Sequence, residues 1–207
     1  MSPPRLHDTV IFDFGGVLVD WNPRYLYRKL FGNDEAGMER FLAEVCTQEW
    51  NARQDAGRPW TEAVAELSAQ HPAQADLIRA FHERWIETLG AAIDDSVTLL
   101  GEVKRAGHRL YGLTNWSHET FPLARPRFPF FDWFDGIVVS GTERLIKPDP
   151  RIFERLVDRY HIDRARAVFI DDNRPNVDAA AGLGIHAIHF RSPAQLRDEL
   201  AVLGLVG

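Results

Sequence analysis

The chain begins with a short apolar segment that ends in a charged residue. Residues 9–12 read Thr-Val-Ile-Phe, and Asp13 follows them directly. An unbroken apolar run predicts a strand buried on both faces, which we extend to residue 14. Gly15 and Gly16 come next and allow a tight turn or the close approach of a ligand. We therefore expect Asp13 at the carboxyl end of a central strand, where open α/β sheets bind ligands.

From residue 23 to about residue 90 the hydrophobic pattern changes to helical spacing, and no run in this part resembles a strand. Apolar residues recur at intervals of three and four, which is typical of helices that bury one face. The helices predicted here cover residues 23–31, 34–45, 61–70 and 77–89. The pattern indicates an all-helical unit inserted after the first strand.

After this unit, strands and helices alternate. The predicted strands cover residues 108–115, 136–140, 165–170 and 186–190, and the predicted helices cover 96–106, 117–123, 149–160, 176–183 and 193–203. Such alternation predicts an α/β fold with a mostly parallel, doubly wound sheet. We place the α/β core at residues 1–20 and 95–207 and the helical cap at residues 21–94.

Composition and charge narrow the class of protein. The chain has 207 residues and a net charge of −6, which argues against a nucleic-acid partner. Its single cysteine, Cys46, excludes an internal disulfide and suits a reducing compartment. No signal peptide is evident at the start, and no apolar run is long enough to span a membrane. We expect a cytoplasmic protein without a membrane partner, and the sequence does not indicate its oligomeric state.

Polar groups follow three of the predicted strands. Asp13, the pair Thr114–Asn115 and the pair Asp171–Asp172 each come where an apolar run ends, and Lys147 lies in a loop before a helix. The carboxyl ends of parallel strands share one edge of the sheet. Carboxylates gathered there repel one another unless a cation compensates them, and oxygen ligands suit Mg²⁺. With a hydroxyl, an amide and a lysine to bind an anion, the pattern predicts a phosphoryl-transfer site.

Each of these residues also has an ordinary structural interpretation. The pair Asp171–Asp172 would suit the N-terminus of the helix that follows it. The pair Thr114–Asn115 would suit a turn, and Lys147 would suit the solvated surface.

The segments FDFGGVLVD, LTNW, IKPDP and FIDDNRPNV, in that order, resemble the four motifs of the haloacid dehalogenase superfamily. Their spacing is also similar, with a helical cap inserted after the first motif. The resemblance covers nearly the whole chain and implies a hydrolase with a Rossmann-like core. The most similar subgroup contains small-molecule phosphatases, including sugar-phosphate phosphatases, and the 2-haloacid dehalogenases.

The resemblance implies a nucleophile and a set of metal ligands. Asp13 matches the nucleophile, which would form an aspartyl-phosphate intermediate. Asp172 matches the principal Mg²⁺ ligand, with Asp171 beside it as a second candidate. Gly15 would offer its backbone carbonyl to the metal, and Asn176 matches a further polar position of the fourth motif.

The same resemblance implies the groups that hold phosphate. Thr114 and Asn115 match the second motif and would bind the oxygens of the transferring phosphoryl group. Lys147 matches the lysine of the third motif, which neutralises charge near the nucleophile.

Gly15 departs from the phosphatase pattern. Phosphatases of the superfamily usually carry a second aspartate there, which protonates the leaving group and then activates water. A glycine side chain can do neither. Asp20 is a distant candidate for the missing group, and a role as a helix cap or hinge suits it better.

Three functions are compatible with these residues. The first is a magnesium-dependent phosphatase acting on a small phosphorylated metabolite, such as a sugar phosphate. The second is a 2-haloacid dehalogenase, which needs no acid at Gly15 but would need an arginine such as Arg40 or Arg53 for the substrate carboxylate. The third is a non-catalytic regulator that binds a phosphorylated ligand. Substrate contacts are expected from Trp116 and from cap residues, among which the candidates are Trp21, Tyr25, Trp50, Asn51, Arg53 and Trp60.

Overall fold

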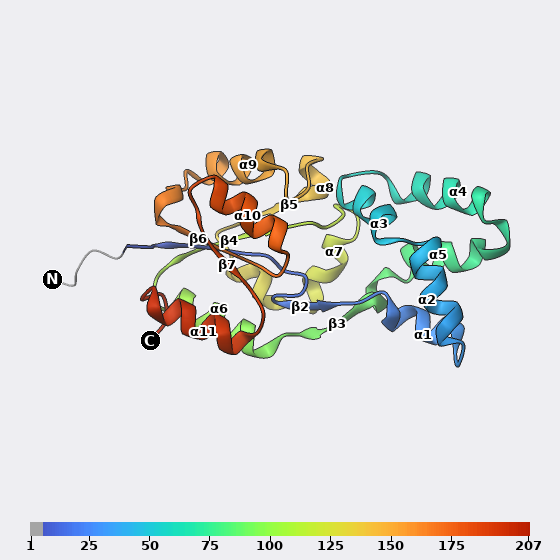
Figure 1. Ribbon diagram of the computed structural model, residues 1–207, viewed down its shortest axis with the longest axis horizontal. Coiled ribbons are helices and arrows are strands. Elements are labelled where there is room, and N and C mark those ends of the chain that lie inside the picture. The colour runs from blue at the N-terminus through green and yellow to red at the C-terminus, as the bar shows by residue number, and fades with distance from the viewer. Residues whose placement is uncertain (1–5) are drawn as a thin grey trace.

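The computed structural model describes residues 6–207, and its centre is a five-stranded sheet. The strands are β1 (Thr9–Phe12), β4 (Arg109–Thr114), β5 (Gly136–Val139), β6 (Ala167–Asp171) and β7 (His186–His189). Their order across the sheet is β5-β4-β1-β6-β7, and all four pairings are parallel (Figure 1). The predicted α/β fold with a parallel, doubly wound sheet is confirmed, and β1 takes the central position.

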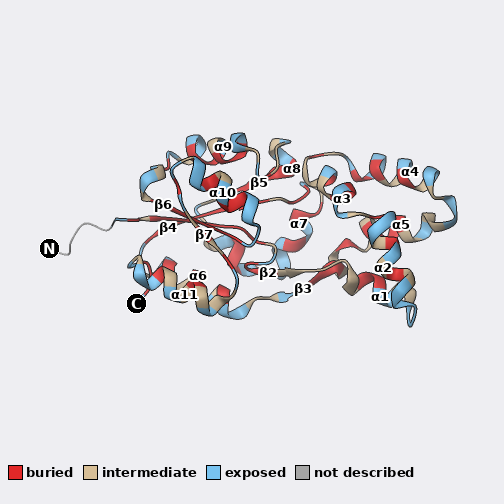
Figure 2. Cartoon of the chain, in the orientation of Figure 1, coloured by how far each residue is buried: buried red, intermediate tan, exposed pale blue. Residues whose placement is uncertain are grey.

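Helices cover both faces of the sheet because successive strand residues point to opposite sides. Val10 and Phe12 belong to one hydrophobic cluster, whereas Ile11 belongs to the other. The first cluster takes in residues of α6 (Asp94–Arg105) and α11 (Pro193–Val202), and the second takes in residues of α9 (Pro150–Tyr160) and α10 (Arg174–Gly182). Figure 1 shows these two helix layers above and below the sheet, and Figure 2 shows that the central strands between them are buried, whereas the edge strand β7 is partly exposed.

The helices α1 to α5 form a separate group beyond one end of the sheet (Figure 1). They are α1 (Arg24–Phe31), α2 (Glu35–Glu44), α3 (Gln48–Asp55), α4 (Trp60–Gln70) and α5 (Ala75–Glu83). Each contributes a buried aromatic residue to a common cluster, and these are Tyr27, Phe41, Trp50, Trp60 and Phe81. These aromatic residues belong to the same hydrophobic cluster as Val10 and Phe12 of the sheet. The division into a core at residues 1–20 and 95–207 and a helical cap at residues 21–94 stays a prediction.

Two short strands join the cap to the sheet-bearing part. The strands β2 (Val19–Trp21) and β3 (Leu89–Ala92) pair antiparallel, so the chain enters and leaves the cap side by side. The prediction that no strand occurs between residues 23 and 90 is therefore wrong at its end, where β3 begins. β2 has only three residues, one of them charged, and β3 consists mainly of glycine and alanine, which are uncommon in strands.

A second difference concerns α3, which the hydrophobic pattern does not predict. Its sequence, QEWNARQD, contains one large apolar residue, yet Trp50, Asn51 and Gln54 are all buried. The Thr47 side chain accepts a hydrogen bond from Trp50 N and so caps the helix. Helices that bury amides in place of apolar side chains carry no amphipathic signal.

The other differences concern the ends of elements. The helix expected at 77–89 is α5, which ends at Glu83, and a 3₁₀ turn and β3 follow it. The helix expected at 117–123 is the shorter α7 (Phe121–Ala124), and the helix expected from residue 61 begins at Trp60. The chain also contains the short helix α8 (Ser140–Glu143) and 3₁₀ turns at Pro72–Gln74, Trp85–Thr88, Arg125–Arg127, Pro129–Trp133 and Arg164–Arg166. Across residues 6–207, none of the helices has the length and apolar character that crossing a bilayer requires.

Candidate active site

The carboxyl edge of the sheet brings the predicted residues together. Asp13 directly follows β1, and its backbone N–H donates to Ile170 O of β6 over 2.9 Å. Asp171 is the last residue of β6, and Thr114 is the last residue of β4. Because β4 and β6 flank β1, the three polar strand ends lie side by side, as expected for parallel strands.

Lys147 lies at the centre of this group. Its Nζ atom is 2.9 Å from Asp13 Oδ1 and 2.7 Å from Asp171 Oδ2, and it also donates to Leu113 O over 2.8 Å. The side chain is 0% exposed, so the alternative of a solvated surface lysine is wrong. A buried ammonium group with two carboxylate partners is compensated in the way that buried charges require.

Asn115 holds the loop that carries Lys147. Its Oδ1 atom accepts from Lys147 N over 2.8 Å, and its Nδ2 atom donates to Lys147 O over 3.0 Å. Both polar atoms of the amide are thus engaged with one residue of the loop. This geometry assigns Asn115 a positioning role, and the expected contact with phosphate stays a prediction.

The two aspartates that follow β6 differ in their surroundings. Asp171 is fully buried, and Asn173 N and Asn176 Nδ2 donate to its Oδ1 over 2.8 and 3.0 Å. Asp172 is exposed to solvent and lines the same cavity as Asp13. Oxygen atoms of Asp13, Asp171 and Asp172 all lie within 4.8 Å of one another. Asp171 is therefore bound by protein donors, whereas Asp172 presents its carboxylate to the cavity.

Burial and charge shift the pKa values of this cluster. Desolvation is the main cause that raises the pKa of Asp13, and Lys147 opposes it. Desolvation also raises the pKa of Asp172, followed by the charge of Asp171. Burial alone would lower the pKa of Lys147, but the neighbouring carboxylates of Asp13 and Asp171 raise it above its usual value. One ammonium group is left to balance three carboxyl groups.

Thr114 and Gly15, which the sequence also assigns to the site, differ in their access to the cavity around Asp13. Thr114 is buried, and it is not among the residues that line the cavity around Asp13. Gly15 does line that cavity, and a Cβ atom built on it would meet no atom within 4 Å. The space beside the nucleophile position is therefore open where an aspartate is usual in the phosphatases that the sequence resembles.

The cavity above Asp13 has a volume of about 310 Å³ and is lined on one side by residues of the cap. The sheet-bearing part contributes, among others, Asn115, Trp116, Lys147, Asp172 and Asn176, and the cap contributes Gln48, Asn51, Ala52, Asp55 and Trp85. Of the expected cap contacts, Trp21 and Asn51 line this cavity. Gln48, Ala52 and Asp55 on α3 were not predicted, because that helix has no hydrophobic signal.

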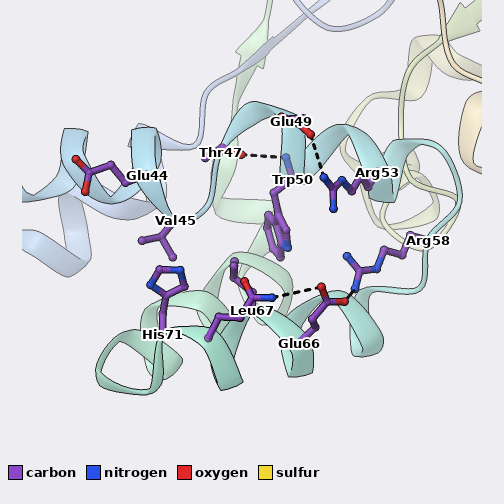
Figure 3. A pocket seen from close by; sticks show the side chains of 11 residues that line it. Glu44, Val45, Thr47, Glu49, Trp50, Arg53, Arg58, Glu66, Leu67 and His71 are labelled. Atoms are coloured by element: carbon purple, nitrogen blue, oxygen red, sulfur yellow. Dashed lines mark hydrogen bonds and ion pairs between the residues drawn. The ribbon is translucent and has the colours of Figure 1, made fainter.

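The other expected cap contacts lie elsewhere. Trp50 and Arg53 face a separate hollow between α3 and α4, where Arg53 pairs with Glu49 and Arg58 pairs with Glu66 (Figure 3). Trp60 is buried in the cap core.

Neither Asp20 nor an arginine reaches the site. The Asp20 carboxylate accepts a hydrogen bond from the Tyr25 hydroxyl, and neither residue lines the cavity. Arg40 lines another surface hollow of the cap. Among residues 6–207, no arginine lines the cavity around Asp13.

Comparison with known proteins assigns the family. The model of the haloacid dehalogenase-like hydrolases matches residues 7–184. The chain therefore belongs to this family and is a hydrolase, as its motifs predict.

Curated relatives include several phosphatases. The chain is 27% identical to a sesquiterpene phosphatase of Aspergillus oryzae over 87% of its own length and 88% of that protein. It is 21% identical to a D-ribitol-5-phosphate phosphatase of Bacteroides thetaiotaomicron over 94% of its length and 97% of that protein. It is also 30% identical to mouse acyl-CoA dehydrogenase family member 10 over 98% of its length, but this covers only 20% of the mouse protein.

Solved structures show the same fold. A haloacid dehalogenase family enzyme of Bacteroides thetaiotaomicron, in complex with magnesium and inorganic phosphate, superposes with a TM-score of 0.65 at 22% identity, over 90% of this chain and 95% of that chain. The L-2-haloacid dehalogenase of Xanthobacter autotrophicus superposes with a TM-score of 0.63 at 18% identity, over 97% and 85% of the two chains. The fold is thus common to phosphate-binding and dehalogenating members.

Proposed function

We propose that the protein is a magnesium-dependent phosphatase that hydrolyses a small phosphorylated metabolite through an aspartyl-phosphate on Asp13. The observation that carries the proposal is the buried Lys147, whose Nζ atom joins Asp13 to Asp171 over 2.9 and 2.7 Å. This arrangement keeps the Asp13 carboxylate fixed at the cavity floor and places a positive charge where the phosphoryl oxygens would lie.

The donor set suits Mg²⁺. Three carboxyl groups have oxygen atoms within 4.8 Å of one another, and Lys147 supplies one positive charge beside them. A further cation would balance the charge of the cluster. Hard divalent cations prefer such oxygen donors. In this proposal Asp13, Asp172 and the Gly15 carbonyl hold the ion, while Asp171 and Asn176 orient their neighbours. When bound, Mg²⁺ reduces the repulsion between a phosphate dianion and the anionic nucleophile.

The protein residues then have defined tasks in the reaction. An Asp13 carboxylate oxygen attacks phosphorus, and the bond from phosphorus to the leaving oxygen breaks. Lys147 neutralises charge on the transferring group, and Asn115 keeps the Lys147 loop in place. Closure of the cap over the cavity excludes bulk water from the first step. Water then hydrolyses the phosphoenzyme and restores Asp13.

The residues that line the cavity favour a substrate with an organic group attached to phosphate. Trp21, Trp85 and Trp116 line the cavity together with the amides of Gln48 and Asn51. A second cavity of about 530 Å³ lies beside it in the cap and shares Trp21, Gln48 and Asn51. Aromatic and amide groups suit a polar ring such as a sugar.

We propose a cytoplasmic location, in keeping with the free, buried Cys46.

The dehalogenase alternative has one observation in its favour and one against it. Gly15 suits a reaction that needs no acid at that position. A 2-haloacid also carries a carboxylate, however, and among the described residues the cavity offers it no arginine but several carboxylates. A cluster of carboxylates suits a substrate that binds through Mg²⁺, and this favours the phosphatase.

Removal of magnesium should abolish activity. Phosphate release is measured from a panel of phosphorylated metabolites and phenyl phosphate, with Mg²⁺ or with excess chelator. We expect release with Mg²⁺ and background rates with chelator, because without the ion Lys147 is the one cationic group beside three carboxyl groups. Release that persists in chelator would refute the metal requirement. Absence of release from every compound, followed by halide release from 2-haloacids, would favour the dehalogenase.

Gly16→Ala should weaken magnesium binding. Gly16 has a φ of +74°, and an added Cβ would collide with the Asp172 carboxylate. Displacing a ligand in this way should cost about 10–100-fold in Mg²⁺ affinity, measured by titration calorimetry. Gly107→Ala is the matched control, because Gly107 has a φ of +82° but no atom within 4 Å of an added Cβ. Equal effects of the two substitutions would show that backbone strain alone is responsible.

A further inference from the structure

The side chain of Asp55 lines the cavity and has no task in the reaction proposed above. Asp55 is the last residue of α3 and lines the cavity from the cap side, while Asp13 lies on the sheet side. Asn51 Nδ2 donates to Asp55 Oδ2 over 3.0 Å, and the backbone N–H of Ser117 donates to the same carboxyl group. The Ser140 hydroxyl donates to the Asp55 backbone carbonyl. Contacts from the cap and from the sheet-bearing part thus fix this carboxyl group at the boundary between them.

The other carboxyl groups of the cavity already have tasks. Among the described residues that line it, the carboxylates are Asp13, Asp55 and Asp172. Asp13 is the proposed nucleophile and Asp172 the proposed metal ligand. Gly15 has no side chain, although the space beside it is open. A reaction that needs a proton donor at the leaving group therefore has one carboxyl group available, and it comes from the cap.

We propose that Asp55 is the general acid and base of the reaction and replaces the side chain that is missing at Gly15. The inference rests on the proposed phosphatase function. It assigns proton transfer to a residue of the cap that lines the cavity opposite Asp13.

The proton balance is complete with this one residue. As Asp13 attacks phosphorus, the electron pair of the breaking phosphorus–oxygen bond goes to the leaving oxygen, and protonated Asp55 gives that oxygen its proton. The product is a neutral alcohol, and Asp55 becomes a carboxylate. Asp55 then accepts a proton from water as the water oxygen attacks the phosphoenzyme. The bond between phosphorus and Asp13 breaks, which releases phosphate and restores both aspartates.

The environment of Asp55 supports both protonation states. Desolvation raises the pKa of Asp55 to about 7, against the lowering effect of the Ser117 amide. A group of this pKa can give and accept a proton near neutral pH. The charged side chains that share its cavity are Asp13, Lys147 and Asp172. Without Asn51 and Ser117 as donors, the charged form would be less accessible after the first proton transfer.

The test compares two leaving groups in Asp55→Asn. Phenolate needs a proton to leave well, whereas nitrophenolate is stable as an anion. We expect kcat/KM, which reports formation of the phosphoenzyme, to fall on the order of 10²–10⁴-fold for phenyl phosphate. The fall for p-nitrophenyl phosphate should be far smaller. Glu49→Gln is the matched control, because Glu49 lies on the same helix with a side chain that is 82% exposed, and both rates should be unchanged.

A second variant separates catalysis from folding. Asp55→Asn combined with Gly15→Asp should recover phenyl phosphate hydrolysis at least tenfold, because the added carboxyl group enters open space beside Asp13. A loss that is equal for both leaving groups, or no loss at all, would overturn the role of Asp55 and leave the phosphatase intact. If the unsubstituted protein releases phosphate from neither compound, the phosphatase proposal itself fails, and this role fails with it.

Discussion

Asp13→Asn should reduce phosphate release on the order of 10⁶-fold, to the background rate, because an amide oxygen is a poor nucleophile for phosphorus. Asp13 directly follows β1, and its side chain contacts Lys147 in a cluster that is almost closed to solvent. No other described carboxylate that lines the cavity lies beside this lysine, so none can take over the attack. Steady-state rates with phenyl phosphate and Mg²⁺ measure the effect.

The matched control for this substitution is Asp8→Asn. Asp8 immediately precedes the other end of β1 and forms an ion pair with Arg166 over 2.9 Å. The substitution removes the same charge as Asp13→Asn, but at the opposite end of β1 from the carboxyl edge. It should leave turnover within a factor of about two to five. An Asp13→Asn protein that retains a tenth of the activity would exclude Asp13 as nucleophile.

Lys147→Met should lower both activity and stability. Loss of a charge that stabilises the transferring group should reduce kcat about 10²–10³-fold. The substitution also leaves Asp13 and Asp171 buried without their ammonium partner, and breaking such a pair costs about 3–5 kcal/mol of unfolding free energy. Denaturant unfolding at neutral pH without Mg²⁺ measures the second effect.

The loss of stability should depend on pH in a defined direction. Burial raises the pKa of Asp13 to about 7 even with Lys147 present, and loss of the lysine raises it further. A carboxyl group with a raised pKa in the folded state weakens folding as the pH increases above its unfolded pKa of about 3.9. The deficit of Lys147→Met should therefore be small near pH 4 and grow toward pH 7 and above.

An exposed lysine provides the comparison for Lys147→Met. Lys29 pairs with Glu87 over 2.8 Å, but its side chain is 56% exposed. Lys29→Met should cost no more than about 1 kcal/mol and should leave kcat unchanged. Equal losses in the two variants would contradict the central position that we give to Lys147.

Strand ends made much of this site predictable from sequence. Asp13, Thr114 and Asp171 each follow an apolar run, and a parallel sheet places such ends on one edge. The order and spacing of the four motifs led correctly to the haloacid dehalogenase-like family. Lys147 was recognisable as a motif residue, but its burial between two carboxylates was not, because that depends on the Asn115 contact with its loop.

The cap side of the site was not predictable in the same way. Helix α3 buries Asn51 and Gln54 in place of apolar residues, so hydrophobic spacing did not reveal it. The sequence pattern therefore does not single out Asp55, although tertiary packing brings it into the cavity. Arg53, which has the charge expected of a substrate contact, faces the other hollow (Figure 3). Residues two positions apart on a helix face different sides, and without the helix their directions cannot be assigned.

Trapping the covalent intermediate tests the mechanism most directly. The protein is mixed with Mg²⁺ and phenyl phosphate, quenched during turnover and treated with borohydride, which reduces an acyl phosphate to an alcohol. Peptide mass spectrometry should then find homoserine at position 13, and Asp13 unchanged when chelator replaces Mg²⁺. Phosphate release by a protein in which residue 13 stays aspartate throughout turnover, or in which another residue is modified, would contradict nucleophilic catalysis by Asp13.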